Sequence, residues 1–202
     1  MSRSSELADF GSSSVIAPIR FIEKKTADGT GDNLVFTSIN SLTQYRNIMF
    51  HMNNIFPASN SDTISLVVAT SGTSYDTSNN YLSINTRSFY DGTTTGGNLG
   101  HFSSKAALMS IGGIGNQATD GNINEADGGI SGKITLYGAP HDVEYHNCHF
   151  ETTNGASDGF IIHSVGSGKY HLNSSPITAV RFKFSSGNIA SGSIAMYGIK
   201  DS

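Results

Sequence analysis

The richest group of potentially reactive side chains lies in residues 141–149, which read His-Asp-Val-Glu-Tyr-His-Asn-Cys-His. Imidazole, thiolate and carboxylate groups bind zinc, but neither a Cys-x-x-Cys nor a His-Glu-x-x-His spacing occurs here. If residues 143–150 form a strand, its alternation places Glu144, His146 and Cys148 on one face and splits them from the other ligands. The pattern favours exposed strand residues or a buried, hydrogen-bonded histidine, and it leaves open a metal shared between subunits on a symmetry axis.

Two glycine-rich segments have the residue pattern of known functional motifs but lack the secondary structure that these motifs require. Residues 155–159, Gly-Ala-Ser-Asp-Gly, spell a nucleophile elbow, but that motif needs a helix after the serine. The apolar residues from Phe160 onward indicate a strand instead. Residues 113–118 form a loose dinucleotide fingerprint, with no helix following to hold a pyrophosphate. We therefore expect a hairpin loop and a chance match, with no catalytic residue and no cofactor.

Acidic residues offer two further possibilities. The stretch 120–128 has oxygen ligands at alternate positions, but Glu125 replaces the turn glycine of an EF-hand and the closing Glu is missing. Calcium in an irregular loop stays open. Glu144 and Glu151 could serve as a glycosidase pair if the fold brought them to the required separation. A polysaccharide-cleaving enzyme is therefore a distant alternative.

The composition points to a domain made of strands and turns. The chain has 202 residues, of which 37% are hydrophobic and only 14% charged, and it contains 23 glycines. A net charge of -4, with 12 Lys and Arg scattered along the chain, provides no basic footprint for nucleic acid. Cys148 is alone, so no intrachain disulfide can form. No run of 18 apolar residues and no signal peptide occurs, so we expect no membrane insertion.

Alternating apolar residues separated by turn signals predict about ten short strands and no helix. The expected strands are 15–22, 34–39, 45–56, 64–69, 81–90, 106–111, 130–137, 143–152, 160–165, 177–184 and 193–199, with polar loops at 91–100 and 112–129. This pattern predicts an all-β fold, a two-sheet antiparallel sandwich that is jelly-roll-like. Residues 1–14 lack periodicity and are expected to form an extended N-terminal arm, with the β-sandwich domain spanning 15–202.

One eight-residue pattern occurs twice, 60 residues apart. Residues 131–138 read Ser-Gly-Lys-Ile-Thr-Leu-Tyr-Gly, and residues 191–198 read Ser-Gly-Ser-Ile-Ala-Met-Tyr-Gly. We expect the two strands to occupy related positions in the two sheets, with Tyr137 and Tyr197 at a rim or a subunit contact, where a ring with a polar tip is useful. The alternative is that the two strands have similar sequences only because they pack in similar surroundings.

The C-terminal stretch 177–199 resembles the closing strands of virion proteins from tailed bacteriophages, especially marine and cyanobacterial ones. Residues 45–71, 75–81 and 129–140 resemble the same family, so the resemblance covers about three quarters of the chain. Residues 6–13, Glu-Leu-Ala-Asp-Phe-Gly-Ser-Ser, are similar to the leading peptide of phage fibre and decoration proteins. The resemblance implies that the arm docks on the virion; its candidate docking residues are Leu7, Ala8, Asp9 and Phe10.

The resemblance also implies a function. It predicts a non-enzymatic jelly-roll protein, a homotrimer, made in the host cytoplasm and placed on the outer surface of the virion. There it would serve as a capsid decoration (cement) or short tail-fibre subunit, bound to other virion proteins such as capsid, portal or tail. The alternative is a receptor-binding module for host attachment, which would bind a host surface glycan through the loops 91–100 and 112–129.

Overall fold

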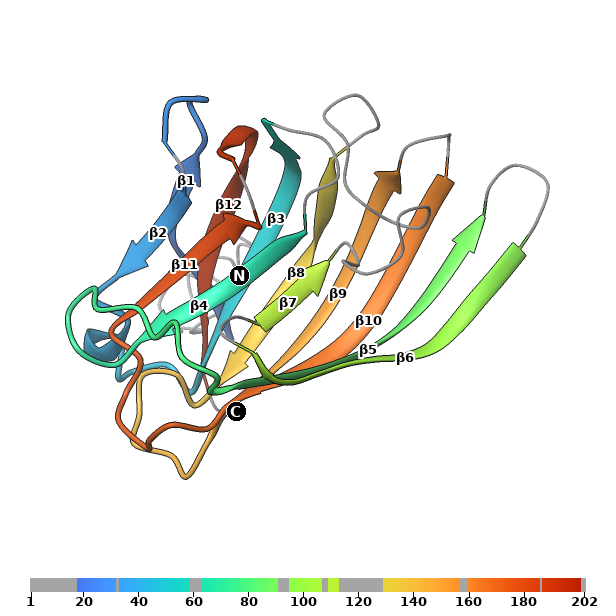
Figure 1. Ribbon diagram of the computed structural model, residues 1–202. Helices are drawn as coiled ribbons and strands as arrows, with labels where there is room; N and C mark the ends of the chain where they lie inside the picture. Colours follow the sequence, from blue (N-terminus) through green and yellow to red (C-terminus); the bar gives the residue numbers. More distant parts are fainter. Residues whose placement is uncertain are drawn as a thin grey trace, which may run out of the picture.

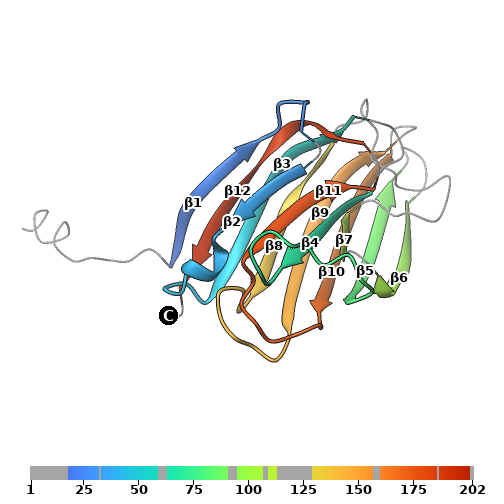
Figure 2. The ribbon, with the colours of Figure 1, turned by 60° about the vertical axis from the view of Figure 1, so that its left-hand side comes forward.

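The computed structural model describes residues 18–31, 33–58, 63–90, 95–106, 109–112, 129–156, 160–185 and 187–200. These residues form two antiparallel β-sheets that face each other, with a single 3-10 turn at Ile39–Ser41 (Figure 1, Figure 2). The predicted all-β, two-sheet sandwich is confirmed. The predicted arm and its docking residues Leu7, Ala8, Asp9 and Phe10 lie outside the described residues.

The two sheets differ in size. The large sheet has eight strands, in the order β1 (Ile19–Thr26), β12 (Ile189–Ile199), β3 (Asn47–Pro57), β8 (Ile130–Tyr137), β9 (His146–Ala156), β10 (Phe160–Tyr170), β5 (Tyr81–Tyr90) and β6 (Thr95–Ala106). The small sheet has four, in the order β2 (Asn33–Thr37), β11 (Ala179–Phe184), β4 (Ile64–Ala69) and β7 (Met109–Gly112). We call the face of the large sheet that meets the small sheet the inner face, and the opposite one the outer face.

The connectivity is that of a jelly roll. Four antiparallel pairs are nested in the chain, β1 with β12, β2 with β11, β3 with β8 and β4 with β7. Successive pairs alternate between the large and the small sheet. This alternation is what two interlocked Greek keys produce, so the jelly-roll connectivity expected from the sequence is confirmed.

Two hairpins are added to this framework and widen the large sheet. β5–β6 is inserted between β4 and β7, and β9–β10 between β8 and β11, so that the order β9-β10-β5-β6 continues the large sheet beyond β8. The sequence predicted a loop over 91–100, but residues 95–100 belong to β6 and pair with β5 (Figure 1). The ladder with β5 overrides the weak strand preference of that glycine-rich stretch.

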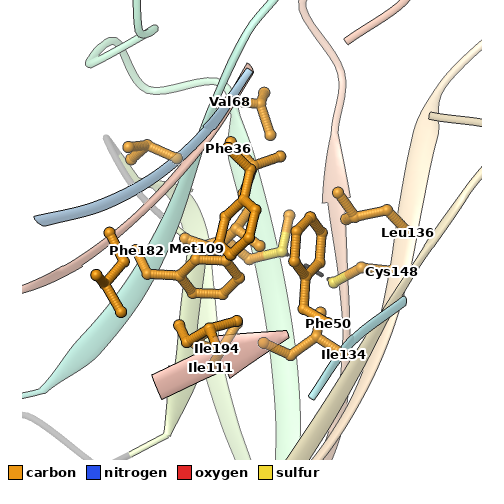
Figure 3. Packing of buried hydrophobic residues seen from close by; sticks show 14 of the residues in the cluster. Phe36, Phe50, Val68, Met109, Ile111, Ile134, Leu136, Cys148, Phe182 and Ile194 are labelled. Atoms are coloured by element: carbon orange, nitrogen blue, oxygen red, sulfur yellow. Dashed lines mark hydrogen bonds between the residues drawn. The ribbon is translucent and has the colours of Figure 1, made fainter. Parts of the chain in front are cut away.

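The core fills the space between the sheets. Three phenylalanines from three strands, Phe36, Phe50 and Phe182, meet edge to face with ring centroids 5.1 to 6.0 Å apart (Figure 3). All six residues of β4 are buried. The stretch predicted as a buried strand at 64–69, apolar except for Ser65, is therefore explained by a strand in the middle of the small sheet, covered on both faces.

Candidate interaction face

The two copies of the Ser-Gly-x-Ile-x-x-Tyr-Gly pattern lie in the same sheet. They form parts of β8 and β12, which flank β3 on its two sides. The expectation that they occupy related positions in two different sheets is wrong. Both strands instead pair with one central partner, and this shared partner gives the repeat a physical cause.

That cause is an irregularity in β3. The register of both neighbouring ladders shifts next to Asn54, a residue with a left-handed backbone (φ 48°). The hydroxyl of Ser131 accepts a hydrogen bond from the Asn54 N–H at 3.0 Å and donates one to its side-chain Oδ1 at 3.1 Å. Gly132 and Gly192 have positive φ and lie where a Cβ would collide with adjacent main chain. Ser131 and Gly192 thus fit β8 and β12 to the bulge of β3, whereas Gly132 permits the close approach of β9.

Tyr137 and Tyr197 both point away from the core, onto the outer face. Their neighbours Leu136 and Met196 are buried, and strand alternation directs the tyrosines to the opposite side. Tyr137 is 44% exposed at the end of β8. The half-buried ring of Tyr197 contacts Phe21 of β1 edge to face, with centroids 5.7 Å apart. The structure therefore places both residues on one accessible surface.

Most exposed apolar side chains of the described chain lie on this outer face. Two groups lie on the two halves of the sheet: a first apolar patch on β1, β12 and β8, made of Ile19, Phe21, Tyr197 and Tyr137, and a second apolar patch on β5 and β10, made of Ile84, Ile161 and Val165. All of these side chains are exposed except that of Tyr197, which is half-buried. Alternation along 81–90 and 160–165 indicates that one face of each strand is exposed to solvent, but it does not show that Ile84, Ile161 and Val165 lie on one surface.

A charged belt runs between the two patches. Lys133 Nζ lies 2.8 Å from Glu151 Oε2, and His163 Nε2 lies 3.4 Å from Glu151 Oε1. The hydrogen bond and charge of Lys133 lower the pKa of Glu151, which is therefore ionised at neutral pH. A hollow of about 270 Å³ opens beside the pair, lined by His51, Ser131, Gly132, Lys133, Glu151 and Thr153. We define the charged belt as the ion pair of Lys133 and Glu151; His51 and His163 lie beside it.

The histidine- and cysteine-rich segment has a structural explanation. β9 begins at His146, so Glu144 lies before the strand, whereas His146 and Cys148 are buried on its inner face as alternation predicted. The Nε2 of His141 donates to the Tyr45 carbonyl at 2.9 Å. Among the described residues no group of three His, Cys, Asp or Glu side chains could hold a metal ion.

His146 is expected to make the stability of the domain depend on pH. Its Nε2 donates to the Ser175 carbonyl at 2.7 Å, while Nδ1 is buried without a partner. Burial lowers the pKa of His146 below 6.5, so the unfolded chain binds its proton more readily than the folded one. The melting temperature should therefore fall as the pH is lowered from 6.5 toward the depressed pKa. His146→Gln removes this titration, and an unchanged pH profile in that variant would contradict the assignment.

The remaining sequence motifs are separated or lie outside the described residues. Residues 155–159 connect β9 to β10, so a strand follows where an elbow needs a helix; Ser157 itself is not described. The stretches 113–118 and 120–128 also lie outside the described residues. Glu144 precedes β9, whereas Glu151 lies about 17 Å along the strand from His146, so the strand does not bring this acid pair together.

The comparisons with known proteins return no match: no family model, no curated protein and no solved structure is similar to this chain. In the described part of the chain, no helix has the length and apolar character needed to span a bilayer.

Proposed function

We propose that this chain is a non-enzymatic structural protein of a bacteriophage virion, a decoration (cement) or short-fibre subunit on the outer surface of the particle. The observation that carries the proposal is the outer face of the large sheet, with its two apolar patches around a charged belt. The jelly-roll topology and the resemblance of residues 177–199 to phage virion proteins support it.

A sheet packed on one side usually alternates apolar residues inward with polar residues outward. Here Phe21, Ile84 and Ile161, which are 54%, 45% and 58% exposed, all face outward together with Tyr137. Grouped apolar side chains on a surface mark contacts with other molecules. An assembly protein needs such a face.

The proposed attachment through the N-terminal arm is tested by deletion. Removing residues 1–14 should abolish incorporation into particles, because the docking residues Leu7, Ala8, Asp9 and Phe10 are lost. The circular dichroism spectrum and melting temperature should stay unchanged, since the core strands begin later in the chain. Incorporation is measured by quantifying the protein in purified particles. Particles that still carry the truncated chain would refute the arm as the anchor.

The second candidate is a module that binds a host surface glycan. The hollow beside Lys133 and Glu151 favours it, since carboxylate, ammonium and hydroxyl groups there could bond sugar hydroxyls. The placement of residues 95–100 in β6 removes much of the loop first expected to bind sugar. A glycan array with the purified chain separates the two functions: a cement protein binds no sugar, and a receptor-binding module gives a specific, saturable signal.

A further inference from the structure

The charged and apolar side chains of the outer face are distributed about the middle of the large sheet. Four strands lie on each side of the boundary between β8 and β9, which is therefore the midline of the large sheet. The first apolar patch lies on one side of this midline and the second on the other. Lys133 and Glu151 are register partners directly across it. The face thus has opposite charges at its midline and apolar groups on both halves.

We propose that this face docks on the same face of a second copy of the chain, about a twofold axis that runs parallel to the strands along the midline. The inference deepens the proposed assembly function and rests on it. A rotation about this axis exchanges the two halves of the sheet, so that β8 faces β9, β3 faces β10 and β12 faces β5 of the second copy. Such a contact is isologous, and each of its interactions occurs twice.

The charges match under this operation. Lys133 of one copy comes to lie over Glu151 of the other, because the two residues pair across the midline. The four groups then form a ring of alternating sign, in which each charge has an opposite neighbour within its own chain and another across the interface. Lys133 and Glu151 are 58% and 42% exposed, so both side chains are free to reach a partner.

One apolar contact also matches under this operation. The strand registers run in one row from Tyr197 through Met49 and Thr135 to His149, Ser167 and Ile84. Reversal of this row about the midline brings Tyr197 over Ile84 of the second copy. Two aligned sheets pack about 10 Å apart, with their strand directions rotated by about 30° relative to each other. This rotation displaces residue pairs far from the centre, such as Tyr197 and Ile84, but leaves Lys133 and Glu151 at the centre opposite each other.

The face is large enough for a stable dimer. With strands about 4.8 Å apart and a rise of about 3.4 Å per residue, an eight-stranded sheet of this length presents roughly 1,100 Å². A standard interface buries about 800 Å² on each partner. Face-to-face pairing of two copies is an alternative to the homotrimer that the resemblance implies.

The first test is the native mass of the purified full chain, measured by light scattering at micromolar concentration. Two copies are expected; a monomer, or a trimer, would overturn the proposal. No particle is present in this measurement. Its failure is therefore distinct from a failure of arm docking, which the deletion of residues 1–14 tests separately.

Charge reversal tests the centre of the interface. In Lys133→Glu, two carboxylates face each other at each of the two symmetric contacts, and in Glu151→Lys two ammonium groups do. Each variant alone should dimerise at least about tenfold more weakly than the wild type, since like charges across an interface are strongly unfavourable. An equimolar mixture of the two should form a one-to-one heterodimer, because one chain then carries both positive and the other both negative charges. Wild-type affinity in either single variant, or no heterodimer in the mixture, would refute the axis.

Cross-linking tests the outer rows without depending on charge. Cysteines placed by Tyr197→Cys and Ile84→Cys in one chain lie five strands apart, about 24 Å, which a bismaleimide of about 10 Å cannot bridge within one copy. The native Cys148 is 2% exposed, and burial raises its pKa to about 12, so it stays unreactive. We expect the double variant to give a covalent dimer and each single variant to give none. A double variant that stays monomeric on a denaturing gel would contradict the predicted facing of Tyr197 and Ile84.

Discussion

Replacing Phe50 by alanine is expected to lower the free energy of unfolding by about 3–5 kcal/mol, the usual cost of truncating a buried phenylalanine. The ring of Phe50 is fully buried and lies at the centre of the sandwich (Figure 3). It contacts Phe36 and Phe182 edge to face, each at 5.1 Å between centroids, and so joins β3 of the large sheet to both strands of the small sheet that carry these rings. Its removal leaves a cavity that close-packed strands cannot fill by small shifts.

Phe21 provides the matched control for this prediction. It is the same residue type in the same sheet, but its side chain is 54% exposed on the outer face and touches only Tyr197 among aromatic rings of the described chain. Phe21→Ala should cost less than about 1 kcal/mol, as expected for surface positions. Both variants are compared by urea unfolding in the Lys133→Glu background, so that self-association does not add to the measured stability. Equal losses at the two positions would contradict the assignment of the core.

Replacing Gly192 by alanine is expected to lower the free energy of unfolding by about 3 kcal/mol or more, because two penalties combine. The residue has φ +103°, a conformation that residues with a side chain rarely adopt. A Cβ would also lie 2.6 Å from the carbonyl carbon of Asn54 and 2.8 Å from the Cα of Ile55, both main-chain atoms of β3. Main chain cannot rotate away as a side chain can, so β12 and β3 would have to separate at the bulge.

Gly72 provides a control that distinguishes the cost of the backbone conformation from the cost of the steric clash. It also has a positive φ, +54°, but no atom lies within 4 Å of the position its Cβ would take. Gly72→Ala should therefore show only the backbone term, about 1 kcal/mol. Chemical denaturation of both variants measures the difference. If Gly192→Ala were no more destabilising than Gly72→Ala, the close approach of β12 to β3 would be wrong.

Local sequence pattern was sufficient to predict the class of fold. Alternation along residues 45–56 predicted a half-buried strand, and the structure has β3 at Asn47–Pro57 with Ile48, Phe50 and Met52 buried. The apolar run at 64–69 predicted β4 to the residue. These predictions succeed because a strand's two faces are encoded by residues next to one another in the chain.

Where pairing between distant segments decides the extent of a strand or its place in a sheet, local sequence pattern gives a wrong prediction or none. Residues 95–100 are rich in glycine and indicate a loop, yet they belong to β6 because β5 supplies register partners for residues 95–99. The repeated Ser-Gly-x-Ile-x-x-Tyr-Gly pattern is visible in the sequence, but the prediction that its two copies lie in different sheets is wrong. Only the strand order shows that both pack against the bulge of β3.

Some features of the candidate interaction face can also be predicted from local sequence pattern, whereas others depend on strand pairing. Local sequence pattern predicts an all-β chain and the buried side of each strand, and it marks Tyr137 and Tyr197 as candidates for a rim or a subunit contact. It could not bring those tyrosines into one face with Phe21, Ile84 and Ile161, nor set Lys133 beside Glu151 at the midline. The physical reason is that a strand specifies which side each residue faces, whereas the neighbours it meets are set by long-range hydrogen-bonded pairing, and the order of strands in a sheet has no local signal in the chain.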